Sequence, residues 1–111
     1  MKIEQSQQGT VAVLVPVGAL IDDDRVQFAE LLKKHIEKGN VKMVVDMNSV
    51  PFVESEGLEM LLDISEAAAE AGGGLRILNP SDIVKDILLC TRLVSKLEVY
   101  HELSDARRSL L

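Results

Sequence analysis

The chain has 111 residues, 47% of them hydrophobic and 27% charged, which is the balance of a globular domain with an aliphatic core. With only 3% aromatic residues and a formal net charge of −6, it is poorly suited to bind nucleic acid or an anionic membrane directly. A basic protein partner suits this charge better. The single cysteine, Cys90, excludes an internal disulfide and is typical of a reducing compartment. We therefore expect one cytoplasmic domain over residues 1–111.

The chain begins with two expected strands. Residues 1–6 alternate weakly between polar and apolar side chains, and residues 10–15 (TVAVLV) are rich in β-branched residues. A tight turn is expected at residues 7–9, so the two strands form an antiparallel hairpin. Pro16 is expected to end the second strand, because it has no N–H to donate to a sheet.

The remaining elements alternate between helix and strand. Three aspartates at residues 22–24 suit the positive end of a helix dipole and predict a helix that ends at Gly39. The elements predicted after it are a strand at 41–47, a helix at 55–71, a strand at 75–78, a helix capped by Asn79, a strand at 97–100 and a helix at 102–111. This order predicts an α/β fold with a mixed, mainly parallel β-sheet, an N-terminal antiparallel hairpin and about four helices.

The sequence offers little for catalysis. His35, His101 and Cys90 show no metal-ligand spacing, and we expect Cys90 to be a packed, unreactive thiol. The three glycines at residues 72–74 follow a helix and precede a strand, the reverse of the order in a phosphate-binding loop. We therefore predict no enzyme activity, no metal and no cofactor.

The helix predicted at residues 55–71 carries the strongest functional signal. Six residues are expected to face the sheet: Leu58, Leu61, Leu62, Ser65, Ala68 and Ala69. Five acids spaced three or four apart form what we call the acidic ridge: Glu56, Glu59, Asp63, Glu66 and Glu70. Met60 and Ile64 lie beside the ridge and are expected to be partly exposed. Like charges four residues apart repel by about 0.2–0.5 kcal/mol, so the ridge is either a solvated face or a docking surface for a basic partner.

Residues 54–57 (ESEG) begin this helix. Ser55 is the expected N-cap, because its hydroxyl can accept from a free N–H of the first turn. Glu56 follows in the first turn, where the helix dipole favours negative charge, and a phosphate would be held there by the same forces. Gly57 is expected to permit the close approach of another chain.

Residues 44–62 (VVDMNSVPFVESEGLEMLL) resemble the signature segment of STAS domains, the bacterial anti-sigma factor antagonist family. In that family a strand ends in aspartate, and Asp-Ser-Ser-Gly or Asp-Ser-Thr-Gly begins the next helix. The segments VAVLVPVGAL, GLRILNPSDIVKDIL and LEVYHEL also fall where the family has its strands and helices. The resemblance implies a STAS-like fold and a protein partner, an anti-sigma factor that is a serine kinase. In the antagonists this kinase phosphorylates the second hydroxyl residue, and the unmodified form binds the kinase.

The resemblance assigns roles by position. Asp46 matches the strand aspartate, Glu54 the motif aspartate, Ser55 the first serine, Glu56 the phosphorylated residue and Gly57 the motif glycine. Glu56 cannot accept a phosphate and carries about half the charge of one at pH 7, so a fixed carboxylate replaces the usual switch. Ser55 is left as an alternative acceptor. The expected partner surface comprises Glu54, Ser55, Glu56, Gly57, Glu59, Met60, Asp63 and Ile64.

Several alternatives stay open. STAS-like proteins also serve as accessory subunits of membrane transporters for lipids or anions, and some relatives are suspected to bind nucleotides. A homodimer through Met60 and Ile64 is a further option.

Overall fold

A computed structural model describes residues 1–92 and 96–111 of the chain. Its elements in chain order are β1 (Lys2–Gln8), β2 (Val11–Val17), α1 (Asp22–Glu37), β3 (Lys42–Asp46), α2 (Ser55–Glu70), β4 (Gly74–Leu78), α3 (Asp82–Thr91), β5 (Val99–Tyr100) and α4 (Leu103–Arg108). The five strands lie side by side in sequence order. β1 pairs antiparallel with β2, and every later neighbouring pair is parallel. The predicted α/β fold class, with its N-terminal hairpin, is confirmed.

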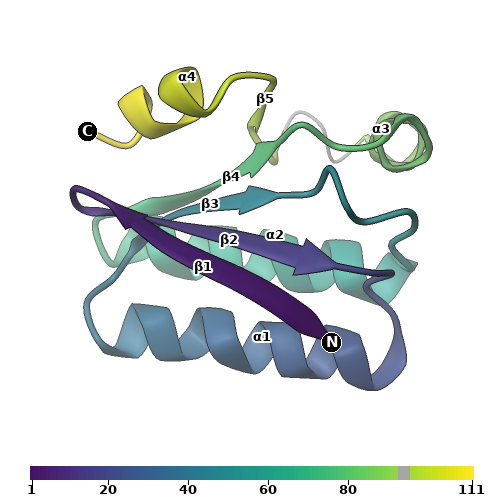
Figure 1. Cartoon of the computed structure of the whole chain (residues 1–111), viewed down its shortest axis with the longest axis horizontal. Coiled ribbons are helices and arrows are strands. Elements are labelled where there is room, and N and C mark those ends of the chain that lie inside the picture. The colour runs from purple at the N-terminus through teal and green to yellow at the C-terminus, as the bar shows by residue number, and fades with distance from the viewer. Residues whose placement is uncertain (93–95) are drawn as a thin grey trace.

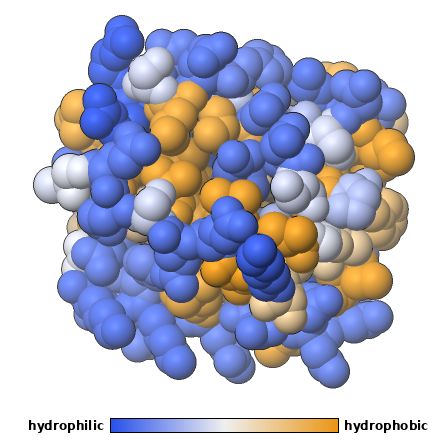
Figure 2. Space-filling view, viewed as in Figure 1, coloured by the Kyte–Doolittle hydropathy of each residue, from blue (hydrophilic) through white to orange (hydrophobic). Residues whose placement is uncertain are grey.

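The two faces of the sheet are covered unequally. Figure 1 shows α1 and α2 side by side over one face and α4 near β4 and β5 on the other. Because side chains alternate along a strand, Ala12 and Leu14 of β2 enter the larger core under α1 and α2, while Val11 and Val13 enter a smaller core under α4. Figure 2 shows apolar side chains reaching the surface between α4 and the strands, where this smaller core is only partly covered.

Some element boundaries differ from the predictions. Pro16 does not end β2, which continues to Val17, because the first residues of β1 pair with this end: Ile3 lies opposite Pro16 and Lys2 opposite Val17. The third helix is capped by Ser81, whose Oγ accepts from the Val84 N–H at 3.4 Å, so the prediction of Asn79 as the cap was wrong. The last strand and the last helix are shorter than predicted.

Cys90 is exposed, contrary to the expectation of a packed thiol. The buried positions of α3 are Val84 and Leu88, four residues apart on one stripe of the helix. Cys90 lies off this stripe, and only one side of α3 packs against the rest of the molecule. No second cysteine is present in the chain, so the exposed thiol has no intramolecular partner.

His35 on α1 connects the hairpin to the helical layer. Its Nε2 lies 3.1 Å from Oε1 of Gln5 on β1, and its buried Nδ1 has no hydrogen-bond partner among the residues that the structure describes. Burial, together with the positive charge of Lys38, lowers the pKa of His35 below its usual value of 6.5. Protonation therefore adds a charge to a ring whose Nδ1 has no acceptor within residues 1–92 and 96–111.

We expect the free energy of unfolding to fall as the pH drops below 6.5, because the unfolded chain then binds a proton at His35 more readily than the folded chain does. Above pH 6.5 the contribution of neutral His35 to the free energy of unfolding is fully present. Urea unfolding at pH 7.5 and pH 5.5 measures the difference. His35→Gln should reduce this pH dependence, and His101→Gln, which removes the other histidine of the chain at an exposed position, is the matched control. Equal pH dependence in both variants would rule out His35 as the cause.

Candidate functional site

The helix α2 begins after the loop that follows β3, at Ser55. Glu54, with φ −77° and ψ 166°, holds the N-cap position, so the prediction of Ser55 as the cap was wrong. The backbone oxygen of Glu54 accepts from the N–H groups of Gly57 at 2.9 Å and Leu58 at 3.2 Å. The Glu54 side chain does not cap the helix, because its carboxylate is turned toward α1. Ser55 lies in the first turn and is exposed.

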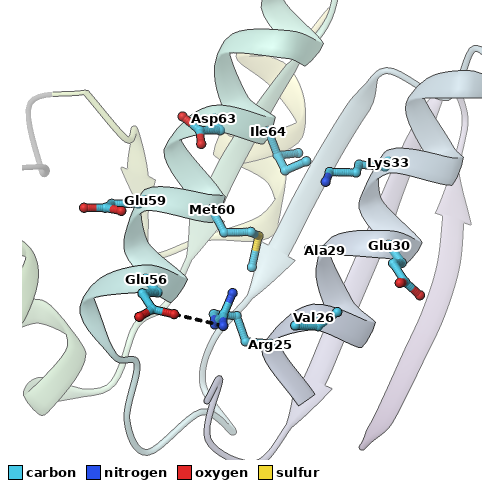
Figure 3. A pocket seen from close by; sticks show the side chains of 10 residues that line it. All are labelled: Arg25, Val26, Ala29, Glu30, Lys33, Glu56, Glu59, Met60, Asp63 and Ile64. Carbon is cyan, nitrogen blue, oxygen red and sulfur yellow. Dashed lines mark ion pairs between the residues drawn. The ribbon is translucent and has the colours of Figure 1, made fainter. Parts of the chain in front are cut away.

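Arg25 of α1 joins the two glutamates at the start of α2. Its Nε lies 2.9 Å from Glu54 Oε1, and one of its terminal nitrogens lies 3.0 Å from Glu56 Oε2 (Figure 3). Glu54 Oε1 also accepts from the Asp22 N–H at 3.1 Å. The Glu56 side chain is 70% exposed, whereas those of Arg25 and Glu54 are 22% and 30% exposed. One guanidinium therefore serves two carboxylates, and part of their negative charge is balanced within the chain.

Sequence reasoning missed Arg25. It lies 29 residues before Glu54, and only the tertiary structure brings the two together. A signal was nevertheless present: Arg25 directly follows three aspartates and is the only basic residue between positions 18 and 32.

Gly57 is buried against its own chain. A Cβ at this position would lie 2.7 Å from Val53 Cγ1 and 3.2 Å from the Leu20 backbone oxygen. The loop before α1 is also hydrogen-bonded to the loop before α2, since the Leu20 N–H donates to the Phe52 oxygen at 3.0 Å. The expectation that Gly57 admits another chain was wrong, because Val53 and Leu20 already occupy that space.

The acidic ridge lies on the surface of α2, and all five of its residues are exposed. Met60 and Ile64, however, are only 9% and 3% exposed, contrary to the expectation that they form a partly exposed strip. Their burial comes from α1, which packs beside α2 on the same face of the sheet. The buried side of α2 therefore lies closer to α1 than was predicted. Ala69, which was expected to face the sheet, is exposed. These two residues cannot form a homodimer contact without exposing the core.

A groove of about 460 Å³ lies between α1 and α2. Figure 3 shows Met60 and Ile64 reaching from α2 toward α1, and Lys33 reaching from α1 toward α2. Glu59 lies on the outer side of α2 and points away from α1, and Asp63 stands at the rim. The structure thus brings the acids of the predicted partner surface together beside a groove, while Gly57, Met60 and Ile64 belong to its packed interior.

Exposed apolar side chains surround the loop that leads into α2. Phe52 is 46% exposed, Val17 at the end of β2 is 40% exposed and Ile83 at the start of α3 is 57% exposed. Pro51 and Ile83 line a second groove of about 670 Å³ between this loop and α3. Interfaces commonly combine such apolar side chains with a charged border.

Asp46 has a structural role at the end of β3. Its Oδ1 accepts from the Asn48 N–H at 3.0 Å, which turns the chain into the loop before α2. Among residues 1–92 and 96–111, no group of three or more His, Cys, Asp or Glu side chains is placed to hold a metal ion. Within the same residues, no helix combines the length and apolar character that a membrane span requires.

The same fold is found in known proteins. The family model of the STAS domain matches residues 2–106, and no sequence among curated proteins matches the chain. A protein of Thermotoga maritima described as an anti-sigma factor antagonist is 20% identical, with a TM-score of 0.90 over 97% of this chain and 93% of its own. Unphosphorylated SpoIIAA of Bacillus is 17% identical, with a TM-score of 0.81 over 97% and 96% of the two chains.

A similar fold also occurs inside a membrane protein. Slc26a9, a murine anion transporter, is 19% identical, with a TM-score of 0.69 over 91% of this chain and 18% of its own. At these identities the structural neighbours share the fold, while the family model covers nearly the whole sequence. The chain therefore belongs to the STAS domain family.

Proposed function

We propose that the chain is a single regulatory domain that binds an anti-sigma factor of the serine-kinase type through the start and the exposed face of α2, without catalysis of its own. The observation that carries this proposal is Glu56. It is 70% exposed in the first turn of α2, at the position that the sequence resemblance matches to the phosphorylated residue of the antagonists. The exposed acids Glu56, Glu59 and Asp63 and the apolar Phe52 nearby supply the two kinds of contact that a stable interface uses.

We further propose that Glu56 keeps the domain competent to bind rather than imitating the phosphorylated form. A phosphate adds about −1.5 to −2 charges at pH 7, whereas a carboxylate adds one. The Arg25 guanidinium, 3.0 Å from Glu56 and shared with Glu54, balances part of that single charge. The start of α2 therefore presents less negative charge than a phosphorylated site would.

Glu56→Lys is expected to weaken binding to the cognate anti-sigma kinase at least about tenfold, because it places a cation beside Arg25 and repels a basic partner. Isothermal titration calorimetry measures the dissociation constant. Glu70→Lys is the matched control, since it makes the same change of charge at the far end of the same helix. If the two variants bind with the same affinity as the unchanged protein, the start of α2 is not the binding site.

Incubation with the kinase and ATP tests the loss of the phosphorylation switch. The unchanged protein should incorporate no phosphate, while Glu56→Ser should accept it in the first turn of α2. Phosphate found at Ser55 of the unchanged protein would show that the switch has moved by one position.

The accessory-subunit alternative is supported by the fold shared with part of an anion transporter. A neighbouring gene for an ATPase or a permease, in place of one for a kinase, would favour it. Nucleotide binding stays a prediction, and calorimetry with GTP and ATP tests it.

A further inference from the structure

The groove between α1 and α2 continues along both helices. The cavity of about 460 Å³ adjoins another cavity of about 380 Å³ between the same two helices, and both are lined by Lys33, Asp63 and Ile64. On α2 the lining extends over residues 56–67, which at 1.5 Å per residue is about 16 Å, or three helical turns. The two cavities are therefore parts of one long depression.

The floor of the groove is apolar and its rims are acidic. Ala29, Ile36, Met60, Ile64 and Ala67 line the floor, and Val26, which is 43% exposed, lines the end near Arg25. The acids along the two sides are Glu30 and Glu37 on α1 and Glu56, Glu59 and Asp63 on α2.

Most of this negative charge is not balanced within the chain. Of the two cations that line the groove, Arg25 is engaged by Glu54 and Glu56, and Lys33 stands near the middle. Across the part of the chain that the structure describes, Glu30, Glu37, Glu59 and Asp63 form no ion pair. A ligand with an apolar stripe and cations on both sides of it would complement this surface.

We propose that this groove seats a basic amphipathic helix of the protein partner, about three turns long, whose apolar stripe meets the floor and whose lysines or arginines pair with the rims. Such a helix presents its apolar residues along one stripe and its charges beside it, which is the pattern that the groove mirrors. A second copy of this chain does not fit, because its own α1 and α2 would bring acids against acids.

This inference builds on the proposed function by naming the chemistry of the partner, and it also says which acids bind the partner's cations. Arg25 already holds Glu56, and Glu59 points away from α1 (Figure 3), so among the acids of α2 the partner's cations pair mainly with Asp63, which lines both cavities. The positive charge of Lys33 repels a basic ligand and therefore lowers its affinity for the groove.

The test uses a synthetic 14-residue peptide of leucine and lysine, patterned as an amphipathic helix, and the full-length ¹⁵N-labelled protein. Titration followed by NMR should shift the backbone amides of Ala29, Lys33, Ile64 and Ala67. Asp63→Asn should weaken binding about two- to fivefold, the effect of one exposed ion pair, and Lys33→Gln should strengthen it by a similar factor. Glu66→Gln is the matched control, because Glu66 is an exposed acid of the same ridge that does not line the groove. Its affinity should stay that of the unchanged protein.

The inference would be overturned by shifts that map to α3 or to the loop before α2, by no binding of the peptide, or by equal effects of Asp63→Asn and Glu66→Gln. Concentration-dependent dimerisation that Val26→Asp abolishes would also overturn it, by assigning the groove to a second copy.

The kinase experiment separates this inference from the proposed function. If Glu56→Lys abolishes kinase binding and Asp63→Asn does not change it, the groove inference fails and the proposed function stands. If the kinase does not bind but the peptide fills the groove, the proposed function fails and the groove stays a site for basic helices.

Discussion

Met60→Ala is expected to lower the free energy of unfolding by about 2–5 kcal/mol, which is the cost of truncating a buried methionine and leaving a cavity. The Met60 side chain is 9% exposed and packs between α1 and α2 within the larger core. Only part of the cavity can collapse, because two helices and the sheet hold its walls in place. Urea unfolding at pH 7.5 measures the change.

Glu59→Ala is the matched control for this variant, since it truncates the preceding, exposed side chain of the same helix and should change stability by no more than about 0.5 kcal/mol. A loss below that value for Met60→Ala would mean that α1 does not cover Met60 in solution. The result also matters for binding studies. A variant at Met60 would lose binding through unfolding, so exposed positions such as Val26 and Asp63 are the suitable probes of the surface.

Gly57→Ala is expected to lower the free energy of unfolding by about 1–3 kcal/mol, as overpacking of a closed site does. In an open helix the same change would stabilise by about 0.5–1 kcal/mol, because alanine is the better helix former. Here the added methyl group would lie 2.7 Å from Val53 Cγ1 and 3.2 Å from the Leu20 oxygen. Val53 can move only by disturbing the loop before α2, and Leu20 only by disturbing the loop before α1.

Ser55→Ala provides the comparison for Gly57→Ala, because Ser55 lies in the same turn but is exposed. Thermal unfolding of the two variants should show a clear decrease in the melting temperature only for Gly57→Ala. An increase for Gly57→Ala would mean that helix propensity outweighs the contact, and that the two loops separate easily. Because Arg25 belongs to α1, which follows the Leu20 loop, a displaced loop should also weaken its contacts with Glu54 and Glu56.

The order and type of the elements could be predicted because they depend on local patterns. The five-residue strand β3 has Met43, Val44 and Val45 all fully buried, which matches the apolar run that predicted a strand covered on both faces. The acidic ridge was equally visible, because acids spaced three and four apart on a helix must share one side. The STAS signature around Glu56 then indicated the family.

The contacts around α2 depended on the tertiary structure. The periodicity of Met60 and Ile64 showed that they lie on one side of the helix, but not that α1 would cover that side. A helix that packs on a sheet and beside another helix buries two neighbouring stripes of side chains, one against the sheet and one against the helix. The apolar periodicity predicted the stripe against the sheet but not the stripe against α1.

The sequence by itself determined an α/β domain with an acid-rich second helix, since hydrophobic periodicity and charge spacing are properties of neighbouring residues. Only the tertiary structure decided that Arg25 pairs with Glu54 and Glu56 and that the acids border a groove. It also decided that Gly57 packs against the loops before α1 and α2. The physical reason is distance along the chain. The crossover from β2 through α1 to β3 places residues about thirty positions apart in contact, and no local pattern encodes which of them meet.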